Sequence, residues 1–321
     1  ACVNRAPARC LKWRETEEMG KRQKKRYREK YRKAEVLTAI CFLLLAVFMW
    51  LYWFFIPAIK SMRLSFYNYS YITPERTEFV GFDNFVRLFH DKDFLKALQH
   101  TFLMVAVVVL LIAVLAFLIA VLLDGNLRGK TFFRTVYYMP YVISAVAVSI
   151  FFMYFFVKGG IGSRFFSLFG LKDTTWFTST KYALFLVIII YVWQQIGFYM
   201  ILYISGLQNI SAELYEVAKI DGANKAQCIW YITFPLVKPT TYLVITLGMI
   251  NAFQIFDQIA AISKQSPLGS PAGSTSTVVT FLYQQSFSYM DMGYGSAAAM
   301  VLLAIIFVLS LVRMLVSRGE N

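Results

Sequence analysis

The chain has 321 residues, 58% of them hydrophobic and 17% aromatic, and its formal net charge is +14. A soluble globular domain has a lower apolar content, because polar groups cover much of its surface, so this composition excludes an ordinary soluble protein. The positive charge does not indicate a nucleic-acid partner. Thirteen of the 32 Lys and Arg residues lie in the first 33 positions, directly before an apolar run.

Six apolar segments are long enough to cross a membrane. The hydrocarbon layer is about 30 Å thick, and a helix crosses it with about 20 residues. The sequence therefore predicts an all-α membrane protein with six transmembrane helices. In chain order, the expected spans are 36–59, 101–123, 136–157, 183–205, 241–262 and 296–316. The first is too long for a cleavable signal peptide, and no small-residue cleavage site follows it.

The distribution of Lys and Arg predicts the orientation. Basic residues concentrate in cytoplasmic segments, and the dense run 21–30 places the N-terminus inside. Both termini are then cytoplasmic, and the segments 67–100 and 264–294 are extracytoplasmic. The chain divides into a basic arm (1–35), whose charges we expect to touch anionic lipid headgroups, a membrane domain (36–316) and a short tail (317–321). The first twenty residues are expected to be an unstructured extension with no assigned role.

Metal and nucleotide sites are not indicated. The four cysteines form no CxxC pair and there are only two histidines, so neither a zinc site nor a disulfide framework is expected. The stretch 125–131 is one residue short of a phosphate-binding loop, and no strand precedes it. We therefore expect a chain that is not an enzyme and holds no cofactor.

The segment 211–239, between the fourth and fifth spans, is the most informative. Ser211 with a carboxylate in the next turn is typical of a helix start, and Gly222 permits a tight turn. A second short amphipathic helix is expected at 225–234, ending at Pro235. The prediction is a helix–turn–helix at the membrane surface.

The residues of this segment also resemble the motif of a known protein family. Glu216-Val-Ala218, then Gly222, then Ile232-x-Phe234-Pro235 resembles the EAA loop (E-A-A-x₃-G-x₉-I-x-L-P) of ABC-importer permeases. All spacings are met, with Val217 and Phe234 as conservative departures. The stretches 65–85 and 129–140 also resemble the carbohydrate branch of the family, which imports maltose, other oligosaccharides or glycerol phosphates. The resemblance covers about residues 36–316.

The resemblance implies a type I importer permease that is moved by partner ATPases. In that family the EAA loop forms coupling helices that seat on a cytoplasmic ATPase, which binds the ATP. Glu216 and Asp221 then become the expected polar contacts, while Ala218, Gly222 and Ala223 allow close packing. The implied partners are a second permease subunit, two ATP-binding subunits, an extracytoplasmic binding protein and membrane lipid. The basic arm and the arrangement usual in this family favour a heterodimer of two different permease subunits, although the sequence does not decide this.

Polar residues at membrane depth are the candidate substrate path, since such residues usually face a cavity or another helix. The candidates are Tyr141, Ser144, Gln194, Gln195, Leu247, Asn251, Gln254 and Asp257. By resemblance, Tyr141, Asn251 and Gln254 match sugar-contacting positions of the maltose permease, whereas Leu247 replaces a small hydroxyl residue there. Substrate contact and bonding between helices both remain open for this set, and Asp257 as an ion site is a weaker alternative.

The sequence offers little support for two other classes of function. A standalone secondary transporter or channel predicts internal repeats, paired broken helices or several intramembrane charges, and only Asp257 fits. An intramembrane enzyme needs a His or Cys cluster or paired acids within the spans, and the sequence has none. The sequence names neither the solute nor the subunit that holds it.

Overall fold

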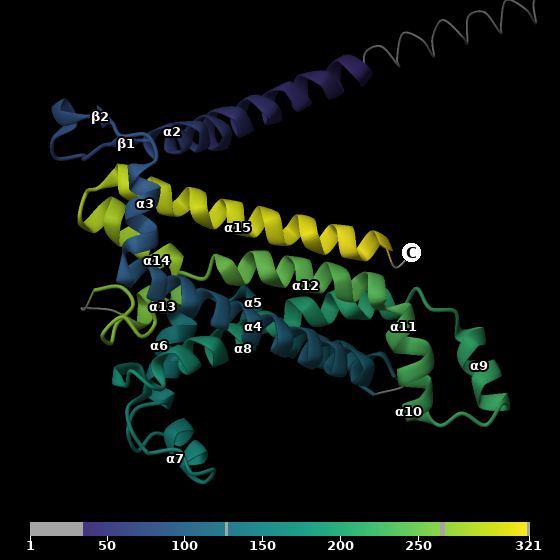
Figure 1. Cartoon of the computed structure of the whole chain (residues 1–321). Helices are drawn as coiled ribbons and strands as arrows, with labels where there is room; N and C mark the ends of the chain where they lie inside the picture. The colour runs from purple at the N-terminus through teal and green to yellow at the C-terminus, as the bar shows by residue number, and fades with distance from the viewer. Residues whose placement is uncertain (1–34, 126–127, 264–266, 320–321) are drawn as a thin grey trace, which may run out of the picture. The chain divides into compact units, whose positions relative to one another are not determined.

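The computed structural model describes residues 35–125, 128–263 and 267–319, in two compact units that divide between Ser61 and Met62 (Figure 1). The first contains most of the helical segment Glu35–Leu64, which is apolar and long enough to span a membrane. This segment includes a π-helical turn, η1 (Leu51–Phe55), and continues into α2 (Ile56–Leu64). Its apolar side chains are exposed within this chain, so it offers them to lipid or to a partner subunit. The basic arm and the extreme C-terminus lie outside the described residues.

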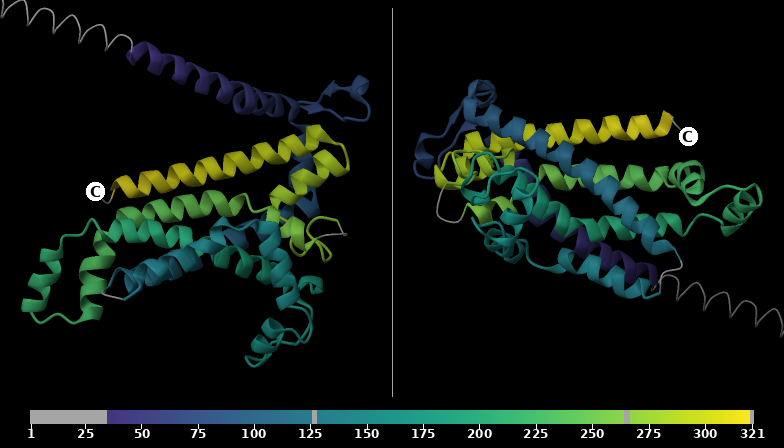
Figure 2. Two further views of the ribbon diagram at one scale, coloured as in Figure 1. Left: turned by 180° about the vertical axis from the view of Figure 1, so that it is seen from behind. Right: turned by 90° about the horizontal axis from the view of Figure 1, so that it is seen from below.

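Four further segments of the second unit are long and apolar enough to span a membrane. They are α4 (Lys92–Asp124), α8 (Ala183–Leu207), α12 (Lys238–Phe253) continued by α13 (Asp257–Ile262), and α15 (Met292–Gly319). The helices run along one common direction in Figure 1, and α4 crosses the others obliquely in the right view of Figure 2. The core lies where α4 and α8 pack together, around Met104, Ile112 and Tyr199. The predicted second, fourth, fifth and sixth spans are confirmed, with ends shifted by up to nine residues, the largest shift being at the start of α4.

The expected third span is not one straight helix. It consists of α5 (Lys130–Val142) and α6 (Ala145–Phe155), which meet at an angle of 99°. Pro140 has no N–H and weakens the last turn of α5, and the backbone is extended at Ile143. The break is not visible in the sequence, because the apolar run continues across it and its stabilising partner comes from α8.

A second interruption divides the fifth span. α12 ends at Phe253 and α13 begins at Asp257, with Gln254 the first residue outside the helix. Short-range bonds close the end of α12, from Gln254 N to Asn251 O (3.1 Å) and from Ile255 N to Ala252 O (3.4 Å). The interruption falls among the polar residues predicted to line the substrate path.

The segment between α8 and α12 forms a helical hairpin at one end of the bundle (Figures 1 and 2). Its first arm is a single helix, α9 (Ala212–Ile220). Its second arm comprises α10 (Lys225–Cys228), a π-helical turn η4 (Ile229–Thr233) and α11 (Phe234–Leu236). The predicted helix–turn–helix is therefore present, and the C-terminal end of α15 lies at the same end of the bundle.

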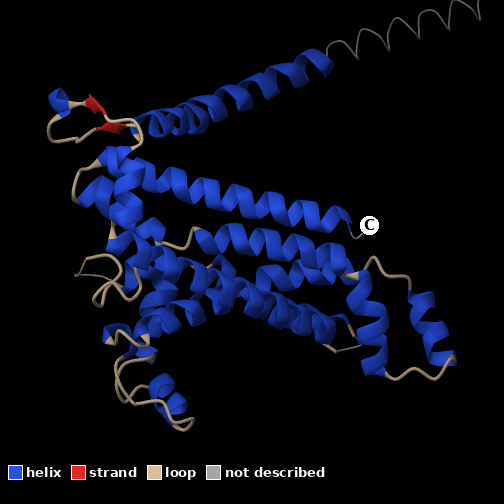
Figure 3. Ribbon diagram, viewed as in Figure 1, coloured by secondary structure: helices blue, strands red, loops and turns tan. Residues whose placement is uncertain are grey.

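The two long segments predicted to be extracytoplasmic pack together at the opposite end. Their elements are β1 (Tyr67–Asn68), η2 (Pro74–Arg76), β2 (Glu78–Phe79), α3 (Asp83–His90), α14 (Val278–Tyr283) and η5 (Gln284–Ser288). β1 and β2 pair antiparallel and are the strands drawn red in Figure 3. Asn84 Nδ2 donates to the carbonyls of Ser65 and Tyr67, both at 3.0 Å. Arg87 forms an ion pair of 3.2 Å with Asp291, which joins the two segments.

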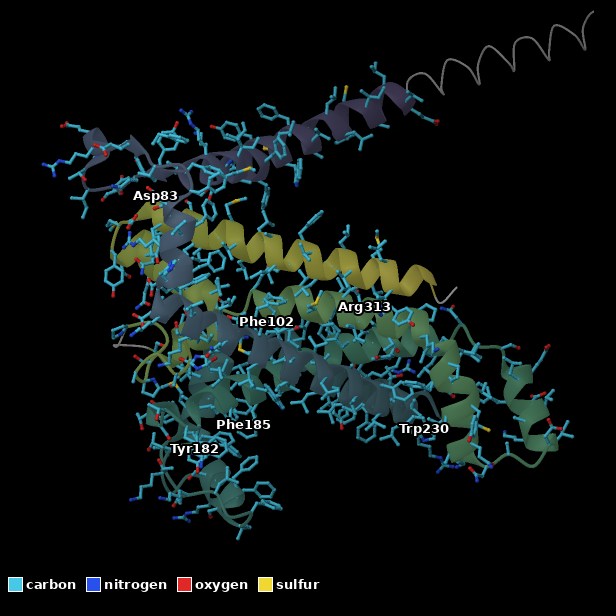
Figure 4. All side chains as sticks on the ribbon, viewed as in Figure 1. Asp83, Phe102, Tyr182, Phe185, Trp230 and Arg313 are labelled. Atoms are coloured by element: carbon cyan, nitrogen blue, oxygen red, sulfur yellow. The ribbon has the colours of Figure 1, made fainter. Side chains whose placement is uncertain are left out.

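The connection from α6 to α8 forms a small aromatic lobe at this same end, where Figure 4 labels Tyr182 and Phe185. It contains α7 (Ile161–Ser167) and η3 (Trp176–Thr178). Trp176 is fully buried, with its ring centroid 4.6 Å from that of Phe156. The aromatic cluster anchors this loop to the C-terminal end of α6.

Candidate functional site

The hairpin of residues 211–239, called the EAA hairpin below, begins as the sequence predicts. The Ser211 hydroxyl accepts a hydrogen bond from Glu213 N (3.3 Å) and caps α9. Gly222 has a φ of 81°, a left-handed conformation that favours glycine. The bond from Ala223 N to Ala218 O (2.8 Å) closes the turn. The motif residues thus sit at a helix C-terminus and its reversal.

The second arm is fixed by its own cap and by one bond to the first arm. Asn224 and Gln227 form a reciprocal capping box, with bonds of 2.8 and 2.9 Å. The hydroxyls of Tyr215 and Thr233 lie 2.9 Å apart and join the two arms. The caps and this hydrogen bond hold the two arms of the hairpin together.

The predicted coupling residues lie at the accessible tip. Glu216, Asp221 and Gly222 are exposed, whereas Ala218 and Ala223 are partly buried. No heavy atom of the chain lies within 4 Å of a Cβ built on Gly222, so its outer face is open to a partner. The structure places Glu216 and Ala218 in the C-terminal half of α9 and the other three predicted coupling residues in the turn that follows it.

Exposed apolar side chains extend this tip, and the sequence reasoning did not single them out. Ile220 is 85% exposed and Tyr231 79% exposed, and Val217 and Trp230 are also exposed. A cavity of about 270 Å³ lies beside them, lined by Asp221, Tyr231 and neighbouring residues. An apolar surface with a few polar groups is typical of a protein docking site. The available signal was Ile220 and Tyr231, which are apolar in a connector predicted to leave the membrane.

Gln194 connects the two broken spans in the membrane region. It is only 4% exposed, and its Nε2 donates to Ile143 O (2.9 Å), the carbonyl left free where α5 ends. Its Oε1 accepts from Gln258 Nε2 on α13 (2.9 Å). Both ends of the Gln194 amide are therefore used between helices, as buried polar groups require. Of the two alternatives left open by the sequence, this geometry supports helix bonding at Gln194.

Polar and aromatic groups of the other candidates lie nearby on α5, α8 and α12. Asn251 Nδ2 donates to the hydroxyl of Tyr199 (3.1 Å), while Asn251 remains exposed within the chain. The Tyr141 ring stacks on Phe198, with centroids 5.0 Å apart. Stacked aromatic faces beside amide groups suit a polyhydroxylated ligand, which needs both ring contacts and directed hydrogen bonds.

The remaining candidates are more dispersed. Gln254 and Asp257 are exposed on the two sides of the break in the fifth span, and Ser144 is exposed at the start of α6. Leu247 is partly buried and packs against the core. Gln195 is half-buried beside Gln194. These positions stay predictions for the substrate path.

The structure is that of a multi-span membrane protein with a helical hairpin at one end of its bundle. A family model for "binding-protein-dependent transport system inner membrane component" matches residues 114–319, and the chain belongs to this family. It is thus a non-enzymatic, multi-pass inner-membrane subunit of an ABC importer.

Relatives agree with this assignment. The chain is 32% identical over 276 residues to the probable ABC transporter permease protein YurN of Bacillus subtilis, covering 84% of this chain and 93% of that protein. It is also 32% identical to the lactose transport system permease protein LacF of Rhizobium radiobacter, covering 87% and 91%. A solved bacterial ABC transporter involved in alginate import has a chain of the same fold. That chain has a TM-score of 0.77 and 23% identity, with 92% of this chain and 99% of that one covered.

Proposed function

We propose that this subunit forms half of a translocation path for a carbohydrate, with a second permease subunit forming the other half. Relatives named as arabinooligosaccharide, multiple-sugar and lactose permeases support a carbohydrate. The stacked Tyr141 and Phe198 rings, together with the exposed amide of Asn251, support it chemically. An extracytoplasmic binding protein delivers the solute to the end that carries α3 and α14. A solved relative in complex with a periplasmic protein supports this partner.

The EAA hairpin is the observation that carries the proposal. Two cytoplasmic ATPase subunits bind ATP and close, and the exposed tip around Glu216 and Gly222 moves with them. The hairpin connects α8 directly to α12, so its motion passes to the helices that bear Gln194 and Asn251. The bundle then alternates between inward-open and outward-open states.

The decisive experiment is reconstitution of the complete transporter in proteoliposomes. ATPase activity and uptake are measured against a panel of oligosaccharides, monosaccharides and glycerol phosphates, each with the binding protein. We expect one carbohydrate class to stimulate ATP hydrolysis and to accumulate inside. Stimulation by glycerol phosphates alone would replace the carbohydrate assignment, and uptake without any ATPase subunit would overturn the importer mechanism.

The role of the tip is tested by Glu216→Lys, which reverses an exposed charge without disturbing a described bond. We expect assembly of the complex to remain and solute-stimulated ATP hydrolysis to be lost. Glu213→Lys is the matched control, with the same charge change on the same helix outside the motif. Equal loss in both variants would assign the effect to the overall charge of α9 and contradict a specific contact at Glu216.

A further inference from the structure

A second cavity lies where the EAA hairpin meets the ends of the spans, and it shares Ala223 and Cys228 with the smaller cavity beside the tip. Its volume is about 380 Å³. Val121 and Asp124 of α4 and Leu207 of α8 form one side, and both arms of the hairpin form the other. Since these are the last turns of two membrane spans, the cavity lies at the level of the lipid headgroups.

The charge of this cavity is positive. Lys219 and Lys225 line it from the two arms, and neither forms an ion pair within the described part of the chain. Asp124, the acid of the lining, lies 3.7 Å from Arg134, which offsets its charge. An anion entering the cavity would therefore meet two uncompensated ammonium groups, while one carboxylate is already paired.

The walls of the cavity are apolar. Val121, Leu207 and Ile229 contribute aliphatic side chains, and the exposed Trp230 lies at the same end of the bundle (Figure 4). Aromatic residues of this kind gather at membrane interfaces. Basic pockets between membrane helices on the cytoplasmic side suit anionic lipid headgroups. A small soluble anion would use the lysines but not the apolar walls.

We propose that this cavity binds one anionic phospholipid of the inner leaflet, with its phosphate between Lys219 and Lys225. The bound lipid bridges the hairpin to α4 and α8 and so sets how firmly the coupling element is held. This inference rests on the proposed orientation, in which the hairpin faces the cytoplasm. It does not depend on the identity of the transported solute.

Cys228 is a built-in reporter, because this partly exposed residue lines the cavity as well as the smaller one beside the tip. In the complete transporter with Cys2, Cys10 and Cys41 changed to Ser, Cys228 is alkylated with N-ethylmaleimide. The transporter is held in lipid nanodiscs of two compositions. One contains phosphatidylcholine alone, and the other contains phosphatidylcholine with phosphatidylglycerol added. We expect alkylation to slow about tenfold when the anionic lipid is present at ten times its Kd. Inorganic phosphate in phosphatidylcholine discs should give no protection.

Matched variants separate a specific site from a general surface effect. Lys219→Gln combined with Lys225→Gln should abolish the protection by phosphatidylglycerol, whereas Lys238→Gln, an exposed lysine outside the cavity, should retain it. Unchanged alkylation in phosphatidylcholine shows that the double variant keeps its cavity. Native mass spectrometry should show one fewer retained phosphatidylglycerol per double-variant chain.

Three results would overturn the proposal. They are equal alkylation rates in both lipids, equal protection in the double variant, and protection by inorganic phosphate alone, which would indicate a soluble anion. Since the readout is binding and not transport, failure of the lipid site is distinguishable from failure of the proposed carbohydrate import.

Discussion

The backbone of Gly222 has a φ of 81°, and the Ala223–Ala218 bond that closes the hairpin turn depends on it. For a residue with a Cβ, the left-handed conformation costs about 1–2 kcal/mol, and more for a β-branched one. Gly222→Val is therefore expected to distort the tip while the membrane helices stay folded. The measurement is solute-stimulated ATP hydrolysis together with uptake, and both should fall.

Gly222→Asn is the control, because asparagine tolerates this conformation better than other residues with a side chain. If the Asn variant keeps solute-stimulated ATP hydrolysis and uptake while the Val variant loses them, the loss is caused by the backbone conformation at position 222. Loss in both would indicate that a partner packs closely against the open face of the turn. Full coupling in the Val variant would contradict a role for this turn.

Gln194 joins Ile143 O to Gln258 inside the bundle, so its removal leaves the Ile143 carbonyl without this partner and the buried Gln258 amide unsatisfied. A buried polar group without a partner costs about 1–3 kcal/mol. Gln194→Leu is expected to lower the thermal unfolding temperature of the detergent-solubilised complex. Gln195→Leu, half-buried with no hydrogen bond in the described structure, should have a much smaller effect. Equal shifts would show that the network does not stabilise the two breaks.

At the scale of elements, helices α5 and α8 approach each other at Gly197. A Cβ built there falls on the backbone of Tyr137, whereas a Cβ on Gly248 of α12 meets only ordinary contacts at 3.8 Å or more. Gly197→Ala is expected to force α5 away from α8 and destabilise the complex. Gly248→Ala should be neutral, or stabilising by up to about 1 kcal/mol, because alanine is the better helix former. Thermal unfolding of both variants gives the comparison.

In the aromatic lobe between α6 and α8, hydrogen bonds to one carboxylate hold two parts of the loop together. The Asp173 carboxylate accepts hydrogen bonds from Gly159 N (2.9 Å) and from the Ser163 hydroxyl, and these bonds lower its pKa below the usual value. The folded lobe therefore prefers the charged form. This preference is present near neutral pH and is lost as the pH falls through the lowered pKa. Asp173→Asn should increase proteolysis of the loop at pH 7, while the difference from the wild type disappears in strong acid.

The predictability of these elements depended on where their stabilising partners lie. The EAA hairpin could be predicted because its cap at Ser211 and its turn at Gly222 are local. The break in the third span could not, since the group that satisfies Ile143 O comes from Gln194, 51 positions later. Within the candidate site, the polar positions were identified by residue type. Their division into bonded and exposed members required tertiary contacts.

For the whole molecule, the two ends of the bundle have different characters. One end carries the EAA hairpin with Lys219 and Lys225, and the other carries α3, α14 and the joined segments around Arg87 and Asp291. Large areas of apolar side chain on α15 remain exposed within this chain. Lipid and a partner permease are the surroundings that would bury them, as expected for one subunit of a membrane assembly.

The orientation of these ends is testable with a membrane-impermeant maleimide on right-side-out vesicles. Single cysteines are introduced by Glu75→Cys in η2 and Glu213→Cys in α9, both exposed, in a background with the four native cysteines replaced. Because basic residues concentrate at the cytoplasmic face, we expect position 75 to react at once. Position 213 should react only after permeabilisation. The reverse pattern would place the hairpin outside, where no ATPase could reach it, and would contradict both the coupling mechanism and the inner-leaflet lipid site.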